Sequence, residues 1–389
     1  MAMAKKALFN ICLFVLIAVF AIPSAMAQQE FVDTAKIQQI PSFNSELSAE
    51  KFTTESKLHE DEPANDRFLA YSIRLPLGWV KGTGAGAVDK LKEDLSTTKS
   101  DFNRRVLGRV AEYYGPGRID AQSRFEIQAQ ALEFEVTAKN WFMQEVLTRG
   151  YILEGLKVVS DSRVEGLYVM VERDVAYVVR AAAEINGARM VMASYYVPDN
   201  HWEEERAQQQ YAIESFKFKN PEKSKIESTR RYSFLDLLSF EYPASWRLIA
   251  PDIVTIEGME ATLIHSIDQK KLAGEIHISV ISTEFDALLQ DELGFLRQEI
   301  TGRGLIIGEL VETKKEYAKP EQVFYNHTEV YQAVDPYEKV LAHEYWMAIM
   351  EEERYFYVVT MLTPARGSEF YTWARNAEAF QTVVESFRQ

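Results

Sequence analysis

The stretch RRYSFLDLLSFEYPASWRLI, residues 230–249, lies past the middle of the chain and has the composition of a domain's first strands. Its aromatic residues lead into Tyr242 and Pro243, and Trp246 follows three positions later. Proline ends a strand ladder because it has no N–H, and a large aromatic ring beyond it can cover the end of a sheet. The stretch therefore predicts that a second domain begins here.

The same pattern occurs near the start of the chain. RFLAYSIRLPLGWVKG, residues 67–82, contains Pro76 and Trp79, and each lies 167 positions before its counterpart in the later stretch. The two segments also end alike, since Trp202 and Trp373, 171 positions apart, each begin a helical run into Glu-Ser-Phe. A repeat of this length predicts two domains in tandem rather than a solenoid of short units.

The middle parts of the two halves also match. Residues 124–155 and 274–309 both have an alternating strand, a helix that ends at Arg-Gly, and a second apolar strand. Residues 175–185, 189–197 and 344–362 have the composition of paired strands around short polar turns. We therefore predict an α+β fold: two tandem domains, each a mostly antiparallel sheet with helices packed on it as an α/β/α sandwich.

Changes of composition along the chain predict where these parts begin and end. The predicted parts are a signal peptide at 1–27, a flexible polar leader at 28–66, a first domain at 67–218 with an insertion at 82–118, a linker at 219–231 and a second domain at 232–389. The leader lacks a sustained apolar period, so it acts as a spacer or as a segment that becomes ordered on a partner. The insertion has no counterpart in the second half, which makes it a candidate contact surface.

The first 27 residues have the layout of a secretory signal. Lys5 and Lys6 precede an apolar run at residues 7–22, which is short for a spanning helix, and small residues follow it. We expect cleavage before Gln28 and a periplasmic or secreted protein; an uncleaved N-terminal anchor is the alternative. Cys12 is the only cysteine, so the predicted mature chain has none and cannot use disulfides or thiolate chemistry.

The charge of the chain limits its partners. The formal net charge is −15, and removal of the two lysines in the predicted signal makes the mature chain more acidic. Nucleic acid and anionic lipid surfaces are poor partners for such a chain. We therefore expect protein partners in the cell envelope, in or near a membrane-associated complex.

One set of side chains is a candidate metal site. A hairpin that turns near Lys271 would set His265 opposite His277, with Glu275 on the same strand face as His277. Two imidazoles and a carboxylate at cross-strand distance could bind zinc or copper. The alternative is a plain surface or half-buried histidine pair. If the metal site exists, the second domain could act as a metal-dependent hydrolase or as a metal or small-ligand carrier.

The opening stretch and the closing FQTVVESF, residues 380–387, together resemble PsbP-like domains. That family includes the PsbP extrinsic subunit of photosystem II and bacterial DcrB-like relatives. The resemblance covers most of both halves, although the first copy has Leu75 before its proline in place of tyrosine. It implies a central antiparallel sheet between helices, and a noncatalytic role in stabilising, assembling or docking on membrane-bound complexes from the exported side.

The sequence contains no recognisable catalytic motif, phosphate-binding loop or calcium loop. We therefore expect an exported, non-enzymatic binding or scaffolding protein, an accessory or assembly component of an envelope complex that needs no cofactor.

Overall fold

A computed structural model describes most of the chain. The described residues are 37–41, 47–82, 108–117, 122–235, 237–250, 258–267, 271–283, 286–314, 325–335 and 343–388. They all lie in one compact unit, Lys36–Gln389. The predicted signal peptide and residues 83–107 of the predicted insertion lie outside them. In the part that is described, no helix has the length and apolar character needed to cross a membrane.

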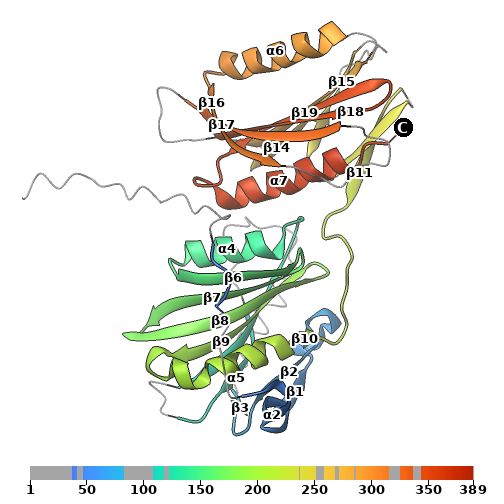
Figure 1. Ribbon diagram of the computed structural model, residues 1–389. Coiled ribbons are helices and arrows are strands. Elements are labelled where there is room, and N and C mark those ends of the chain that lie inside the picture. The colour runs from blue at the N-terminus through green and yellow to red at the C-terminus, as the bar shows by residue number, and fades with distance from the viewer. Residues whose placement is uncertain are drawn as a thin grey trace, which may run out of the picture. The chain divides into compact units, whose positions relative to one another are not determined.

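The first half of the described chain forms a seven-stranded antiparallel sheet. Its strands are β3 (Val80–Lys81), β4 (Gly108–Tyr114), β5 (Arg124–Ala131), β6 (Ile152–Ser160), β7 (Arg163–Glu172), β8 (Val175–Asn186) and β9 (Arg189–Pro198). They lie in the order β3-β4-β5-β9-β8-β7-β6, so β6 is an edge strand (Figure 1).

The second half repeats this arrangement within its described residues. Its strands are β13 (Arg247–Ile249), β14 (Gly258–Ile267), β15 (Lys271–Ser282), β16 (Ile306–Lys314), β17 (Tyr325–Val334), β18 (His343–Glu351) and β19 (Tyr355–Pro364). They lie in the order β13-β14-β15-β19-β18-β17-β16. The two orders are the same strand for strand, with β16 in the place of β6, which confirms the predicted duplication at the level of topology.

Helices cover both faces of each sheet (Figure 1). The main helices are α4 (Ala138–Thr148), α5 (Trp202–Ser215), α6 (Asp286–Gly302) and α7 (Phe370–Glu385). In the first half α4 contacts β6, β7 and β8, while α5 contacts β8 and β9. In the second half α6 contacts β16, while α7 contacts β15 and β19. The predicted α+β class and the layered packing are confirmed.

Each half opens with two paired strands outside its large sheet. They are β1 (Ser56–Asp61) and β2 (Tyr71–Pro76) in the first half, and β11 (Thr229–Phe234) and β12 (Leu238–Pro243) in the second. In the first half, β10 (Lys217–Phe218) adds a third strand to this small sheet by pairing with β2. Both β2 and β12 end at the proline that the sequence singled out. Trp79 and Trp246 are 7% and 1% exposed, so both are core residues as predicted.

Part of the predicted flexible leader is folded. Residues 49–54 form α2 (Ala49–Thr54), whose first turn is capped by the Ser48 side chain. Strand β1 follows and pairs with β2 along its whole length. The prediction was wrong here because β1, with sequence SKLHED, is mostly exposed and polar, so it has no apolar alternation to reveal it. Short 3-10 helices at Pro63–Asn65, Arg67–Leu69 and Asp199–His201 complete the described elements.

The predicted insertion at 82–118 also needs correction. Its last part contains β4, which pairs with β3 and β5 and has the place that β14 has in the second sheet. The two halves therefore share this strand, and the segment specific to the first half is shorter than predicted. The mismatch arose because β4, with sequence GRVAEYY, has little resemblance to its counterpart.

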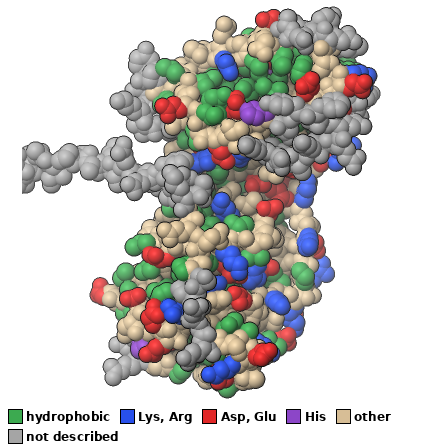
Figure 2. All heavy atoms as spheres, in the orientation of Figure 1, with side chains coloured by type: hydrophobic (Ala, Val, Ile, Leu, Met, Phe, Trp, Pro, Cys, Tyr) green, Lys and Arg blue, Asp and Glu red, His purple; other side chains and the backbone are tan. Residues whose placement is uncertain are grey.

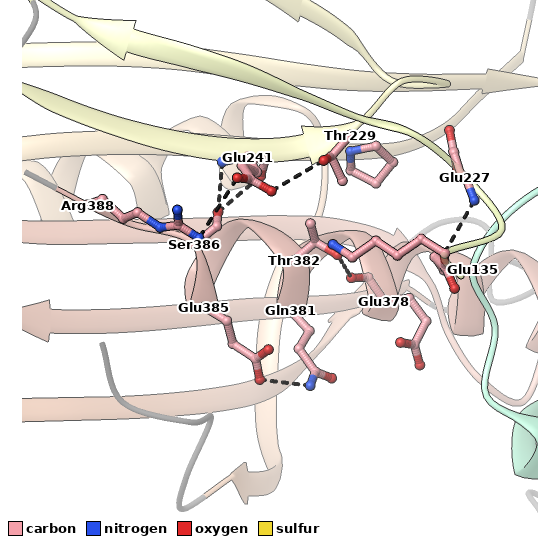
Figure 3. A pocket seen from close by; sticks show the side chains of 12 residues that line it. Glu135, Glu227, Thr229, Glu241, Glu378, Gln381, Thr382, Glu385, Ser386 and Arg388 are labelled. Atoms are coloured by element: carbon pink, nitrogen blue, oxygen red, sulfur yellow. Dashed lines mark hydrogen bonds and ion pairs between the residues drawn. The ribbon is translucent and has the colours of Figure 1, made fainter. Parts of the chain in front are cut away.

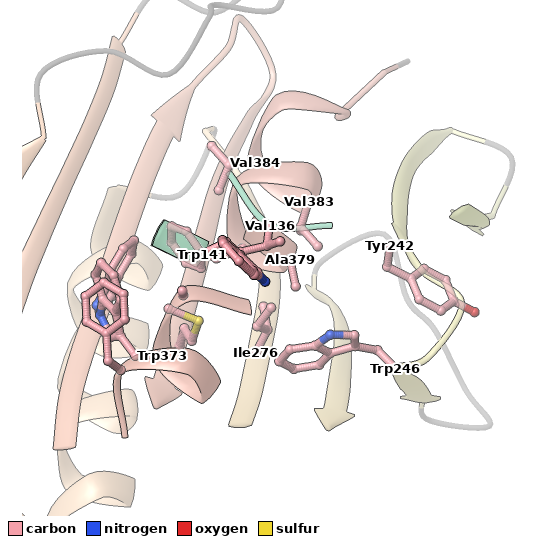
Figure 4. Packing of buried hydrophobic residues seen from close by; sticks show 14 of the residues in the cluster. Val136, Trp141, Tyr242, Trp246, Ile276, Trp373, Ala379, Val383 and Val384 are labelled. Carbon is pink, nitrogen blue, oxygen red and sulfur yellow. The ribbon is translucent and has the colours of Figure 1, made fainter. Parts of the chain in front are cut away.

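A large apolar cluster includes residues of both halves. Helix α4 contacts α7, and Val136 and Trp141 belong to the same cluster as Ala379 and Val383 (Figure 4). Trp141 is 3% exposed and Val383 is fully buried. Burial of a side chain of this size typically contributes about 1.5 to 3 kcal/mol. The cluster therefore stabilises the position of α7, whose polar face carries several of the charged side chains described below.

Candidate functional site

The two predicted metal-ligating histidines do not face each other. In the register of β14 and β15, His265 pairs with Gly274 and His277 pairs with Thr262. Leu263 pairs with Ile276, and side chains alternate between faces along a strand, so His265 and His277 lie on opposite faces of the sheet. The predicted pairing was wrong because Ile267 pairs with Lys271, which places the turn before Lys271, and a bulge at His265/Ser266 shifts the register further.

His265 is a core residue. It is 4% exposed, its Nδ1 lies 3.0 Å from Oδ1 of Asn376 on α7, and its ring lies 5.3 Å from that of Trp246. Asn376 is held in turn, since its Nδ2 donates to Thr363 Oγ1 at 2.9 Å and to the backbone. Burial, together with the nearby charge of Arg375, lowers the pKa of His265 to about 4. The imidazole is therefore a neutral structural group that joins α7 to the sheet.

The pKa of His265 predicts an acid-sensitive step in stability. Its folded-state pKa of about 4 lies below the ordinary 6.5, so the unfolded chain takes up the proton first. The free energy of unfolding should decrease as the pH falls from 6.5 towards 4, by up to about 3 kcal/mol from this group. NMR titration of the His265 ring should give a midpoint near 4; a midpoint above 6 would contradict the buried neutral imidazole.

The other two predicted ligands are engaged elsewhere. His277 Nδ1 lies 3.2 Å from Thr262 Oγ1, and its Nε2 lies 4.0 Å from the carboxylate of Glu292 on α6. Glu275 is paired with Arg303 through two bonds of 2.6 and 2.9 Å. In the described part of the chain, no three His, Cys, Asp or Glu side chains are arranged to hold a metal ion. His265, His277 and Glu275 thus do not form the predicted zinc or copper site.

A polar pocket of about 350 Å³ lies along the outer face of α7 (Figure 3). The residues that line it are Glu135, Lys225, Glu227, Thr229, Glu241, Pro243, Glu378, Gln381, Thr382, Glu385, Ser386 and Arg388. It contains five glutamates and two basic side chains, so its charge is negative. A second pocket of about 540 Å³ shares Glu135, Lys225 and Glu378 with it.

Most of these glutamates have structural hydrogen bonds. Glu135 accepts from the backbone N–H of Ile226 at 2.6 Å, and Glu227 accepts from that of Ser245, also at 2.6 Å. Glu241 accepts from Arg231 and from Thr229, at 3.1 and 3.2 Å, and the bond from Arg231 is the main reason that its pKa is lowered. Glu135 thus joins the first half's loop to the start of the second half, while Glu227 and Glu241 bond within the start of the second half. The carboxylates of the pocket therefore act mainly as acceptors of structural hydrogen bonds.

Glu378 differs from the other acids of the pocket. Burial raises its pKa to about 7, and the neighbouring charges of Asp161 and Glu135 act in the same direction, while Lys314 opposes them. No side-chain hydrogen bond to another described residue holds its carboxylate. A half-buried carboxyl with a pKa of about 7 gains or loses its proton near neutral pH, so the charge of the pocket changes at Glu378 in this range.

Replacing Glu378 with glutamine should therefore stabilise the protein at alkaline pH. The folded-state pKa of about 7 lies above the ordinary 4.5, so native Glu378 costs stability as the pH rises from 4.5 through 7. Glu378→Gln removes this cost and should gain about 2 kcal/mol at pH 8 and little at pH 4.5, because part of the side chain remains at the surface.

Urea unfolding at several pH values measures the effect. Glu385→Gln is the matched control, because Glu385 is exposed and its one hydrogen bond to a described side chain is from Gln381 of its own helix. A gain for Glu378→Gln that is the same at pH 4.5 and pH 8 would contradict the assignment. Since His265 acts in the opposite direction over an overlapping range, the wild-type profile should be flatter than that of the variant.

Both sheets end in an edge strand with exposed aliphatic side chains. On β6, Ile152 is 64% exposed and Val158 and Val159 are about half exposed; on β16, Ile306 is 54% and Leu310 is 50% exposed. An edge strand has a row of backbone groups without a strand partner, so it can pair with a further extended segment. Figure 2 shows hydrophobic side chains reaching the surface in both parts of the molecule.

An extended segment of the chain lies on one of these edges. Residues 37–41 run beside β6, where the backbone N–H of Leu156 donates to the carbonyl of Gln38 at 2.9 Å. Ile37 packs against the large apolar cluster. Gly155 allows the close approach, because a Cβ at this position would lie 2.8 Å from the Cα of Ile40. This part of the predicted leader thus contacts the protein's own sheet.

Comparisons with known proteins show a weak likeness of fold. No protein-family model matches the chain, and no curated protein matches it. Cyanobacterial PsbP from Synechocystis sp. PCC 6803 has 12% identity and a TM-score of 0.30, over 46% of this chain and 98% of that one. The resemblance to PsbP-like domains therefore extends to weak similarity of fold, and membership of the family is not shown.

Two further solved structures cover more of the chain. The Tle4-Tli4 complex has 11% identity and a TM-score of 0.20, over 86% of this chain and 97% of that one. The T6SS immunity protein TplEi from Pseudomonas aeruginosa has 12% identity and a TM-score of 0.21, over 88% and 98%. At these scores the likeness carries no argument about function, which must come from the chain's own residues.

Proposed function

We propose that this protein is an exported, non-enzymatic binding or scaffolding protein that acts as an accessory or assembly component of a cell-envelope complex. The observation that carries the proposal is the pair of edge strands, β6 and β16, with exposed aliphatic side chains on both. One of these edges already has an extended segment docked against it. Pairing through a sheet edge is a common way for a domain to bind a polypeptide.

Other features support the same proposal. The layout of residues 1–27 supports export, and the acidic composition supports protein rather than nucleic-acid partners. The duplication gives one chain two similar edges, so it could contact two partners or two parts of one partner. Two sites on one chain raise the overall affinity, because the second contact forms within the complex.

Photo-crosslinking in the exporting cells tests the proposal. A photoreactive residue is placed at Val159 on β6 or at Val311 on β16, both of which are exposed. The control position is Glu204, which is exposed on α5, away from both edges. We expect discrete adducts with envelope proteins at one or both edges, and no such adducts at the control position.

The same samples test export. The mass of the mature chain should correspond to cleavage before Gln28. The same pattern of adducts at all three positions, or no adducts at either edge, would contradict the binding proposal. A chain that retains residues 1–27 in soluble extracts would contradict export by a cleaved signal.

A further inference from the structure

Residues 37–41 cover only part of the β6 edge. The strand spans Ile152–Ser160, and the bond from Leu156 to Gln38 is the one backbone hydrogen bond that the described residues make across its outer side. Gly155 and Leu156 are buried beneath the segment, whereas Ile152 and Val158 remain exposed on either side of it. As far as the described residues go, the contact is therefore short, and the side chains of Ile152 and Val158 stay exposed beyond its ends.

The edge is built for close approach at one position. Ile40 lies so near Gly155 that a Cβ would meet its backbone Cα at 2.8 Å and its backbone N at 3.1 Å, which real Cβ atoms do not tolerate without movement. In the matching strand β16, a Cβ on Gly308 would have its nearest neighbour at 3.5 Å, which is ordinary contact. Among the described residues of these two edge strands, a docked segment thus requires glycine at position 155 of β6 but not at position 308 of β16.

We propose that the β6 edge is a strand-accepting site that residues 37–41 occupy in cis, and that its occupant in a complex is an extended segment of a protein partner with two aliphatic residues three positions apart. This inference rests on the proposed binding function and names the partner's chemistry. The chain's own segment, with Ile37 and Ile40, defines that chemistry. Exchange is feasible because, among the described residues, one backbone bond and two half-buried side chains hold the segment.

The cis segment acts as a competitor. A partner peptide binds only the fraction of molecules whose edge is open, so its apparent dissociation constant rises as the reciprocal of that fraction. If the segment occupies the edge nine-tenths of the time, its release should strengthen peptide binding about tenfold.

The test uses the full mature chain and a fluorescent peptide with the sequence of residues 34–42, TAKIQQIPS. Ile37→Asp/Ile40→Asp releases the segment, because a carboxylate is costly to bury against an apolar cluster. We expect this release variant to bind the peptide at least about tenfold more tightly than the wild type does. Adding Gly155→Val should abolish binding, whereas adding Gly308→Val should not.

Amide hydrogen exchange gives a second readout. The Leu156 N–H should be protected in the wild type, exchange faster in the release variant, and become protected again when the peptide is added. Equal affinity of the wild type and the release variant, or binding that survives Gly155→Val, would overturn the inference. Leu156 protection that persists in the release variant would overturn it as well, since residues 37–41 would not be what covers the edge.

The two proposals fail in different ways. If the peptide does not bind but Val159 or Val311 still forms adducts with envelope proteins, the partner chemistry is wrong and the binding function stands. If no adducts form at either edge, the binding function itself is wrong, whatever the peptide does.

Discussion

Replacing Glu344 with glutamine is expected to lower the free energy of unfolding by about 3 to 5 kcal/mol. Glu344 is 3% exposed and accepts from three buried donors: Arg366 Nε at 2.7 Å, Trp373 Nε1 at 2.8 Å and Trp346 Nε1 at 3.0 Å. The neutral amide leaves the guanidinium of Arg366, whose side chain is only 10% exposed, without its buried counter-charge. A buried charge that loses its partner carries the full cost of desolvation.

Glu312→Gln is the control for this experiment. Glu312 also bonds to Arg366, at 3.1 Å, but its side chain is 41% exposed, so its loss should cost less than about 1 kcal/mol. Urea or thermal unfolding of both variants at neutral pH gives the comparison. Similar losses for the two variants would show that Glu344 is not the centre of the network.

Truncating Trp246 to alanine is expected to cost about 3 to 5 kcal/mol, as is usual for a buried tryptophan. The indole is 1% exposed and packs beside the ring of His265, where α7 meets the sheet. The backbone N–H of Trp246 also bonds to the carbonyl of Pro243 at 3.0 Å, which fixes the turn after β12. The loss should come from the cavity and not from the turn, because alanine keeps the backbone bond.

Trp246→Phe separates these two causes. Phenylalanine fills most of the space, so it should recover more than half of the stability that alanine loses. The His265 ring is a local reporter: in the alanine variant its NMR midpoint should move up from about 4 towards 6.5, because water gains access to the imidazole. An unchanged midpoint together with a small loss of stability would show that Trp246 does not seal this part of the core.

The fold was largely readable from local signals. Pro243 and Trp246, with their counterparts Pro76 and Trp79, mark the same place in two domains because a strand end and a core aromatic need those residue types. The alternating runs likewise predicted the long strands β8, β9, β18 and β19. An element with a polar sequence, such as β1, could not be predicted in this way. Strand β1 is stabilised by its pairing with β2, and its own sequence gives no sign of that pairing.

The site was less predictable because it depends on register and tertiary contact. A shift of one residue moves a side chain to the other face of a sheet, so a misplaced turn and a bulge were enough to separate His265 from His277. The pKa of Glu378 is raised first by burial in the folded protein and then by the charges of Asp161 and Glu135, which are distant in sequence. For the β6 edge, the one available sequence signal was the glycine at position 155 within an otherwise strand-like run.

The identical strand order of the two sheets also has a consequence for how the chain folds. In each sheet a central strand, β5 or β15, pairs with a strand that is synthesised much later, β9 or β19. Because β9 and β19 have equivalent places in the two sheets, β5 could pair wrongly with β19 during folding. The correct pair places Arg124 opposite Tyr196, with the guanidinium 4.1 Å from the ring centre, and this contact favours β9. During synthesis β9 also emerges long before β19, so the first sheet can close before its competitor exists.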